Sequence, residues 1–329
     1  MILKLKNLKN EHNFYGYADT SAKDGIGIDD VFSEMGELLN RIKGKNDQKQ
    51  NMKILNEKYG IVEEDFLSAE LEIVPAMKAK SLGFDRSMVG GYGQDDKVCS
   101  YCSLKAITEI ENPKRTAVCL LVDKEEIGSI GNTGMESLAF ETFLGELLAL
   151  TGENKTPNAL HRLYQHSKML SADVDGAFDP IYASVADKRN ASFFGFGVGM
   201  NKYTGGRGKS SASDANAEFV AEIRKLFDDN KVRYQLAELG KVDEGGGGTI
   251  AYILANKGMD VIDCGVPVLS MHAPYEVTSK FDIYMSYKAY ASFFVAGWKS
   301  EATAGRPKGD RRTTRYKKRK IEVKNIDIL

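Results

Sequence analysis

The sequence predicts a three-layer α/β fold in which a mixed β-sheet is flanked by helices on both faces. Strand-like and helix-like patterns alternate between about residues 57 and 299, which is typical of strands joined by covering helices. The chain has 329 residues, of which 42% are hydrophobic, so it can bury a large core. No apolar run approaches the roughly 18 residues that a membrane span needs, and no membrane association is expected.

The first 56 residues are polar and rich in lysine and glycine. Their one helical pattern covers residues 29–42, and the Lys-, Asn- and Gln-rich residues 43–51 after it are interpreted as a linker. The next helix is expected over residues 96–110, where apolar residues recur with helical spacing. Cys99 and Cys102 fall in this helix and could form a redox pair or half of a zinc site. No second cysteine pair follows, so we favour core packing.

The remaining elements follow in alternating order. The apolar residues 116–122 have the length of a buried strand. The same criteria then predict a helix at 134–150, a glycine-rich strand at 193–199, a helix at 214–229, a strand at 234–239, a helix at 249–257, a strand at 261–264 and a closing helix at 280–295.

A basic tail follows the last predicted helix. Residues 306–320 contain nine basic residues and one acid, in a chain whose net charge is −1. Residues 300–329 have no helical apolar period and are expected to be disordered. Such a segment could bind nucleic acid through phosphate contacts, but a solvated tail is the favoured interpretation, and nucleic acid is not expected as a partner.

Acidic residues and one histidine fall at the ends of the predicted elements. Asp95 precedes a helix, Glu125 and Glu126 follow the buried strand, Asp173 lies in a turn, and His272 follows the last strand. Open α/β sheets build their sites at such ends. Carboxylates and an imidazole are a ligand set for a pair of divalent ions that activate water, which predicts hydrolytic chemistry.

The neighbouring pair Glu125 and Glu126 fits this chemistry. One carboxylate can bind metal while the other takes the proton of the attacking water as a general base. The alternative is a solvated acidic turn, because doubled glutamates are common in soluble proteins.

These motifs, in this order, resemble the aspartyl aminopeptidase (vacuolar aminopeptidase I) family of dizinc exopeptidases. The matching segments are Tyr-Gly-Gln-Asp-Asp at 92–96, Val-Asp-Lys-Glu-Glu-Ile-Gly-Ser at 122–129, Ser-Ala-Asp at 171–173, Gly-Gly-Thr-Ile at 247–250 and Asp-Cys-Gly-Val-Pro-Val-Leu-Ser-Met-His at 263–272. The resemblance covers about residues 57–299. It implies a zinc exopeptidase-like (phosphorylase/hydrolase-like) fold and a zinc-dependent aminopeptidase that acts on peptides.

The resemblance also assigns roles to residues. It implies that Asp95 bridges two metal ions, that Glu126 is a terminal ligand, and that Asp173 and His272 each hold one of the two ions. Glu125 is then the general base. The implied ions are two Zn²⁺, with Co²⁺ or Mn²⁺ as alternatives, and the peptide bond that follows Asp95 is expected to be cis.

The sequence departs from the family at its first metal ligand. That ligand is a His in an upstream His-Thr-Asp-Ser-Pro motif, which this chain lacks. Residues 1–72 are therefore expected to be a remnant of the inserted dimerisation domain, 73–299 the catalytic domain and 300–329 the tail. The alternative is a catalytically incomplete fragment or structural subunit, unless a second polypeptide supplies the His.

Two further expectations concern specificity and assembly. Gly176 and Asp179 replace histidines of the better-known members, so the preference of the family for acidic N-terminal residues is not carried over. The resemblance implies a homo-oligomer, which is a dodecamer in the family. Four scattered cysteines suit a reducing compartment, and the cytoplasm is the expected location.

Overall fold

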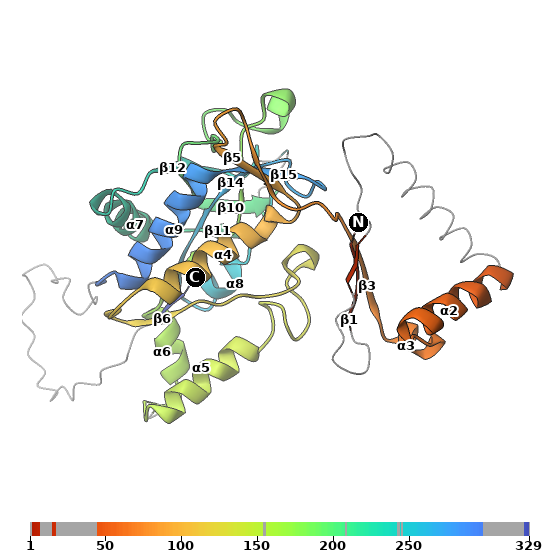
Figure 1. Cartoon of the computed structure of the whole chain (residues 1–329). Coiled ribbons are helices and arrows are strands. Elements are labelled where there is room, and N and C mark those ends of the chain that lie inside the picture. The colour runs from red at the N-terminus through yellow and green to blue at the C-terminus, as the bar shows by residue number, and fades with distance from the viewer. Residues whose placement is uncertain are drawn as a thin grey trace, which may run out of the picture. The chain divides into compact units, whose positions relative to one another are not determined.

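The computed structural model describes residues 2–6, 15–17, 45–153, 156–207, 209–241, 244, 246–298 and 326–328. The chain forms two compact units, Met1–Ala79 and Lys80–Leu329 (Figure 1). The interpretation of residues 1–72 as a remnant of a dimerisation domain stays a prediction. No helix among the described residues is long and apolar enough to cross a membrane.

The first unit contains a small antiparallel sheet. Its central strand β1 (Ile2–Lys6) pairs with β2 (Tyr15–Tyr17) on one side and with β3 (Glu70–Val74) on the other. Among the described residues between β2 and β3 lie the helices α2 (Lys45–Tyr59) and α3 (Glu63–Leu67).

The linker predicted at residues 43–51 is wrong from Lys45 onward, because α2 begins there. Lysine and glutamine are good helix formers, and a polar composition does not by itself prevent a helix. The helix predicted at residues 29–42 lies outside the described residues.

A six-stranded sheet organises the second unit. Neighbouring strands are parallel except β9 and β13, which are antiparallel, so the predicted mixed sheet is confirmed. In spatial order the strands are β12 (Tyr234–Ala237), β9 (Val198–Asn201), β13 (Asp260–Gly265), β7 (Lys168–Ser171), β16 (Ile326–Ile328) and β6 (Thr116–Val118).

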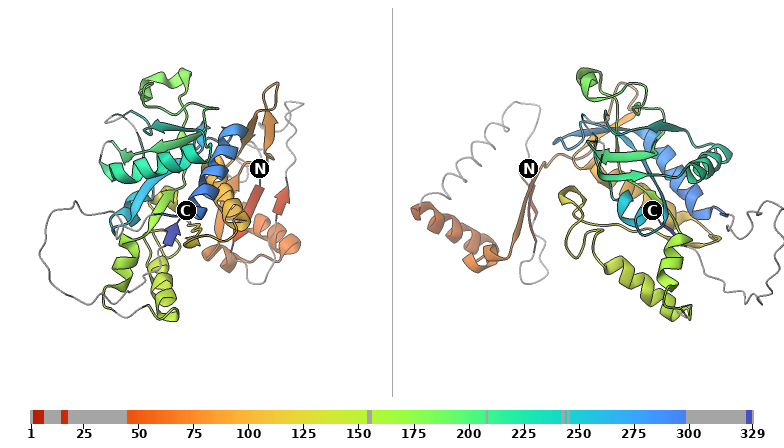
Figure 2. Two further views of the ribbon diagram at one scale, coloured as in Figure 1. Left: turned by 90° about the vertical axis from the view of Figure 1, so that its left-hand side faces the viewer. Right: turned by 180° about the vertical axis from the view of Figure 1, so that it is seen from behind.

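Helices cover both faces of this sheet. In β13, Val261 belongs to one buried hydrophobic cluster and Ile262 to another, because successive residues of a strand point to opposite faces. The Ile262 cluster includes α4 (Gln94–Glu109), α7 (Ala217–Asp229) and α9 (Lys280–Val295); the Val261 cluster includes α5 (Ala139–Leu150), α6 (Ala159–Gln165) and α8 (Ala251–Ala255). Helices α4 and α9 lie side by side (Figure 2). The predicted three-layer fold is confirmed.

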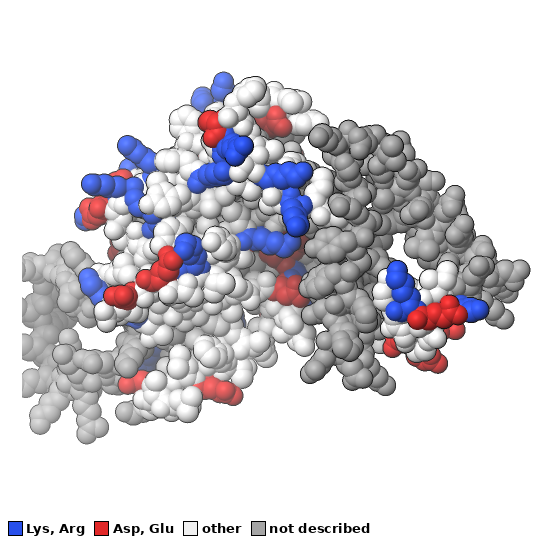
Figure 3. All heavy atoms as spheres, in the orientation of Figure 1, with Lys and Arg blue, Asp and Glu red and all other residues white. Residues whose placement is uncertain are grey.

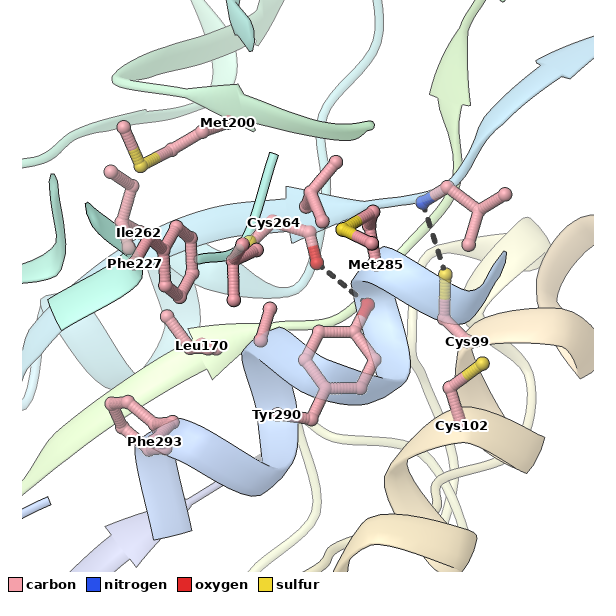
Figure 4. Close-up of a cluster of buried hydrophobic side chains, with 14 of the residues drawn as sticks. Cys99, Cys102, Leu170, Met200, Phe227, Ile262, Cys264, Met285, Tyr290 and Phe293 are labelled. Atoms are coloured by element: carbon pink, nitrogen blue, oxygen red, sulfur yellow. Dashed lines mark hydrogen bonds between the residues drawn. The ribbon is translucent and has the colours of Figure 1, made fainter. Parts of the chain in front are cut away.

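The cluster beneath α4 and α9 contains three of the four cysteines. The Tyr290 hydroxyl donates a hydrogen bond to the carbonyl of Cys264 (2.8 Å), and the Cys99 thiol accepts one from the amide of Val266 (3.5 Å) (Figure 4). Both Cys99 and Cys102 are buried in this cluster. The predicted packing of these two cysteines in the core is confirmed.

A second sheet of five short strands was not predicted. Its pairs are antiparallel except the last, and its order is β4 (Lys80–Leu82), β5 (Met88–Gly91), β15 (Glu276–Ser279), β14 (Pro267–Leu269) and β8 (Asp175–Gly176). Strands of two to four residues are too short to produce a recognisable alternation. A separate hairpin joins β10 (Tyr203–Gly206) to β11 (Ser210–Asp214).

The predicted elements agree best where local chemistry marks a boundary. Helix α9 has the predicted bounds, and α7 begins at Ala217 because the Asn216 side chain caps it by accepting a hydrogen bond from the Phe219 amide (2.8 Å). The strand predicted at 193–199 is wrong for its first five residues. They form a loop, and strand β9 begins only at Val198.

The loop before β9 is held by a buried carboxylate. Asp282, at the start of α9, accepts hydrogen bonds from the amides of Gly195 and Gly197, both at 2.7 Å. Gly197 has φ +100°, and a Cβ there would lie 2.1 Å from the carbonyl oxygen of Arg233. Glycine is therefore required at this position.

Most of the basic tail lies outside the described residues. Its short segment Ile326–Ile328 is strand β16, where the sequence predicted no element. On the face shown in Figure 3, the lysines and arginines of the described residues are interspersed with acids. The expectation of a disordered tail stays a prediction for the other residues of 300–329.

Asp263 is a buried acid on the α8 side of strand β13. Its carboxylate accepts hydrogen bonds from the hydroxyls of Thr249 (2.6 Å) and Thr204 (3.2 Å). Burial nevertheless raises its pKa to about 6, because the charged form loses its hydration.

We expect Asp263 to make the fold less stable as the pH rises. Between its unfolded pKa of about 4 and its folded pKa of about 6, the folded chain keeps a proton that the unfolded chain has lost. The stabilising contribution is therefore complete below about pH 4 and is lost as the pH rises through 6, by up to about 3 kcal/mol. In Asp263→Asn this dependence should vanish, because the threonine hydroxyls can rotate to suit an amide.

Denaturant unfolding between pH 4 and pH 7 measures the free energy of unfolding of the wild type and of Asp263→Asn. Asp228→Asn, which changes an exposed acid on α7, is the control. A difference in the free energy of unfolding between wild type and Asp263→Asn that does not change with pH would contradict the prediction.

Candidate metal centre

Three side chains with metal-ligand atoms converge in the second unit. One ligand atom each of Asp95, Glu126 and His272 lies within 4.8 Å of the other two, and no other group of three such residues does so in the described part of the chain. The His272 Nε2 atom is 2.9 Å from Asp95 Oδ2 and 3.2 Å from Glu126 Oε2. The Asp95 side chain is 9% exposed, against 62% for His272 and 57% for Glu126. The centre therefore has a buried base and a solvent-exposed rim.

Asp95 lies where strand β5 leads into helix α4. Gly93 has a left-handed backbone with φ +70°, and Asp95 itself is not helical, with φ −79° and ψ 114°. The backbone turns here before the regular helix begins, so the carboxylate stands at the helix start. The peptide bond between Asp95 and Asp96 is cis, which confirms that expectation.

Both glutamates lie in one tight turn after β6. Glu125 and Glu126 begin the 3₁₀ turn η1 (Glu125–Ile127), which Lys124 enters with a left-handed backbone, φ +62°. The amide of Gly128 closes the turn on the carbonyl of Glu125 at 2.8 Å. The turn brings the Glu126 carboxylate to His272, and the half-buried Glu125 lies directly beside it in the chain.

His272 lies in the turn between β14 and β15. Its backbone is left-handed, with φ +63°. Its amide donates a hydrogen bond to the Glu276 carboxylate at 2.8 Å, and the amide of Asp95 donates one to the same carboxylate at 3.1 Å. Sequence reasoning missed Glu276, because a contact with two backbone amides leaves no motif in the sequence.

Asp173 is partly buried and lies outside this group of three. Its Oδ1 atom accepts a hydrogen bond from the amide of Val174 (2.8 Å). Its pKa is raised well above the usual range, mainly by burial and then by the negative charges of Asp96 and Asp95. The backbone of β13 passes close by, since a Cβ on Gly265 would lie 1.4 Å from the carbonyl oxygen of Asp173. Only glycine fits there.

Several acids in and around the centre have raised pKa values. Burial raises the pKa of Asp95 to about 7, and the charge of Glu126 raises it further, while His272 opposes the shift. The pKa of Glu125 is raised by burial and by Glu126. Asp96 is partly buried and has a strongly raised pKa, mainly through the burial of its carboxyl group. Its buried Oδ1 atom has no hydrogen-bond partner among the described residues.

These observations fit a bound zinc ion. Carboxylate oxygens and an imidazole nitrogen are ligands that zinc uses, and an ion would compensate the charges that burial disfavours. The structure therefore gathers Asp95, Glu126 and His272, with Glu125 beside them and Asp173 electrostatically coupled to Asp95. The individual roles of these residues stay predictions.

Comparison with known proteins identifies similar chains. The profile of the family described as aminopeptidase I zinc metalloprotease (M18) matches residues 19–294. The "Probable M18 family aminopeptidase 1" of Clostridium acetobutylicum is 57% identical over 268 residues, which cover 78% of this chain and 57% of that protein. The crystal structure of aminopeptidase I from the same organism has a TM-score of 0.69 at 54% identity, and the match covers 75% of this chain and 52% of that chain.

A more distant structure shares the fold. The S. cerevisiae mApe1 dodecamer has a TM-score of 0.57 at 22% identity, with 74% of this chain and 54% of that chain covered. At this identity the likeness shows the fold alone. The chain spans little more than half the length of the curated relatives it matches.

Replacing His272 should remove a zinc ligand. We expect His272→Ala to lose one bound zinc, with an affinity at least about 10-fold to 100-fold lower, because even residues that only support a ligand contribute that much. Elemental analysis of zinc after dialysis measures the loss. His161→Ala, which removes an exposed imidazole on α6, is the control and should keep the zinc content of wild type. Equal zinc content in both variants would exclude His272 as a ligand.

Proposed function

The chain belongs to the aminopeptidase I zinc metalloprotease family (M18), and from this membership we propose that it is a zinc-dependent aminopeptidase that hydrolyses the N-terminal bond of peptides. The observation that carries the proposal is the convergence of Asp95, Glu126 and His272 next to Glu125. Membership in the family alone would be compatible with a chain that had lost these side chains.

We assign the ligands to two zinc positions. Asp95, Glu126 and His272 would hold one ion, and Asp95 and Asp173 would contribute to the other. Bound zinc would polarise the scissile carbonyl group and lower the pKa of water. Co²⁺ or Mn²⁺ can use the same oxygen and nitrogen ligands, so the donor set does not select zinc over them.

Glu125 acts as the general base in this proposal. Its carboxylate takes a proton from the attacking water as the water oxygen bonds to the carbonyl carbon, and it returns the proton to the amine as the carbon–nitrogen bond breaks. Its half-buried position and raised pKa support this role, because a carboxylate of raised pKa is a stronger base. Its neighbour Glu126 is directed at His272, which leaves Glu125 available for proton transfer.

A structural or catalytically incomplete subunit is the second candidate. The observation in its favour is that the second zinc position has only Asp95 and Asp173 as predicted ligands. A catalytic zinc normally has three protein ligands. The number of tightly bound ions decides between the candidates: two per chain support the enzyme, whereas one or none supports the incomplete subunit.

We propose a homo-oligomer in the cytoplasm. The dodecameric assembly of mApe1 supports an oligomer, and a dodecamer is the specific form proposed. All four cysteines are free, which suits a reducing compartment.

The role of Glu125 gives a direct test. We expect Glu125→Gln to keep its zinc while kcat on an aminoacyl p-nitroanilide falls at least about 100-fold, because the amide cannot accept the proton. Steady-state kinetics and zinc analysis on the same samples measure both quantities. Glu146→Gln, on an exposed position of α5, should retain the kcat of wild type. Unchanged kcat in Glu125→Gln would remove this residue from the mechanism.

A further inference from the structure

We infer that Glu276 is a positioning residue of the metal centre, because its carboxylate binds the backbone amides of both Asp95 and His272. The inference rests on the proposed zinc centre. In this inference Glu276 touches neither the ion nor the substrate. It fixes the positions of two ligands relative to each other.

The geometry of this contact is specific. Glu276 is the first residue of β15 and is 2% exposed. Its Oε2 atom accepts the amide hydrogen of Asp95 at 3.1 Å, and its Oε1 atom accepts that of His272 at 2.8 Å. Asp95 and His272 are far apart in the sequence, and one side chain therefore joins the two backbone segments that carry them.

Glu276 is itself held in a fixed frame. It pairs with Gly91 of β5 in the five-stranded sheet. The Gln94 amide group donates to the carbonyl oxygens of Glu276 (3.3 Å) and Val89 (2.8 Å), and the Thr278 hydroxyl donates to Gln94 Oε1 (2.8 Å). The residue before Asp95 is thus tied to the same strand as Glu276. The backbone of Glu276 and the segment that carries Asp95 are therefore both fixed to β15.

The ligands depend on such support to different degrees. The His272 side chain is 62% exposed, so packing constrains it little, and its position follows from its backbone. That backbone is left-handed, which is uncommon outside glycine, and the hydrogen bond to Glu276 stabilises it. Asp95 is nearly buried but lies outside the regular part of α4. The hydrogen bond to Glu276 gives the Asp95 amide a partner that the helix does not provide.

A carboxylate is the group that satisfies both amides. It offers two equivalent acceptor oxygens, and its charge strengthens both hydrogen bonds. Glutamine has the same shape but one acceptor oxygen, and its NH₂ group would face an N–H donor. A buried amide would then remain unpaired, which costs stability and frees one ligand to move.

The chain provides a matched control for this effect. Asp282 is also a buried carboxylate that accepts two backbone amides, those of Gly195 and Gly197, both at 2.7 Å. Neither amide belongs to a proposed ligand. Asp282→Asn should therefore destabilise the fold in the same way as Glu276→Gln while leaving the ligands of the centre in position.

The experiment compares the full chain with the variants Glu276→Gln and Asp282→Asn. Zinc affinity is measured by competition with a chromophoric chelator, ligand geometry by the visible spectrum of bound Co²⁺, and stability by denaturant unfolding. We expect both variants to be less stable. Only Glu276→Gln should bind zinc about 10-fold to 100-fold more weakly and change the Co²⁺ spectrum.

Several outcomes would overturn the inference. Wild-type zinc affinity in Glu276→Gln would do so, and so would an equal loss of affinity in Asp282→Asn, which would make the effect one of general stability. If Glu276→Gln does not fold, Glu276→Asp replaces it. Its shorter carboxylate reaches only one of the two amides, and it too should weaken zinc binding. Failure of the wild-type chain to bind zinc would instead overturn the proposed centre itself.

Discussion

The charge of a buried carboxylate must be compensated. The carboxylates of the scaffold and those of the candidate metal centre differ in how far the protein does this. Transfer of an ionised carboxylate out of water is costly unless hydrogen bonds or an opposite charge replace the water. Two threonine hydroxyls compensate Asp263 in part, and pairs of backbone amides do so for Asp282 and Glu276. Burial still raises the pKa values of Asp263 and Asp282 to about 6. Asp96, by contrast, has an oxygen without a partner. The acids that the scaffold leaves poorly compensated gather where a cation is expected.

The two sheets of the second unit meet in this centre. Glu126 follows β6 of the six-stranded sheet, whereas Asp95 and His272 follow β5 and β14 of the five-stranded sheet. A cation held by all three would therefore link the two sheets at a second place, since β13 already continues into β14 after one residue. Because the unfolded chain lacks such an arrangement, the binding free energy of the ion adds to the stability of the folded state.

The parts of the fold that could be predicted from the sequence are those in which apolar residues recur with a regular period over a long segment. Helix α7 has such a period, and it lies within its predicted span, residues 214–229. The short strands of the second sheet have none, and the glycine-rich residues before β9 resemble a strand although they form a loop. The side chains of the candidate centre were predicted from their motifs. Glu276 was not, because its contact joins one buried side chain to two distant backbone amides.

The unequal exposure of the centre bears on how rapidly an ion can be exchanged. Asp95 lies at the buried base, while His272 and Glu126 form a rim that is more than half exposed. An ion bound there would enter and leave past this rim without any opening of the core, so unfolding would not limit its exchange. Occupancy would then follow the free concentration of the ion around the folded protein, rather than the supply of metal at the moment the chain folds.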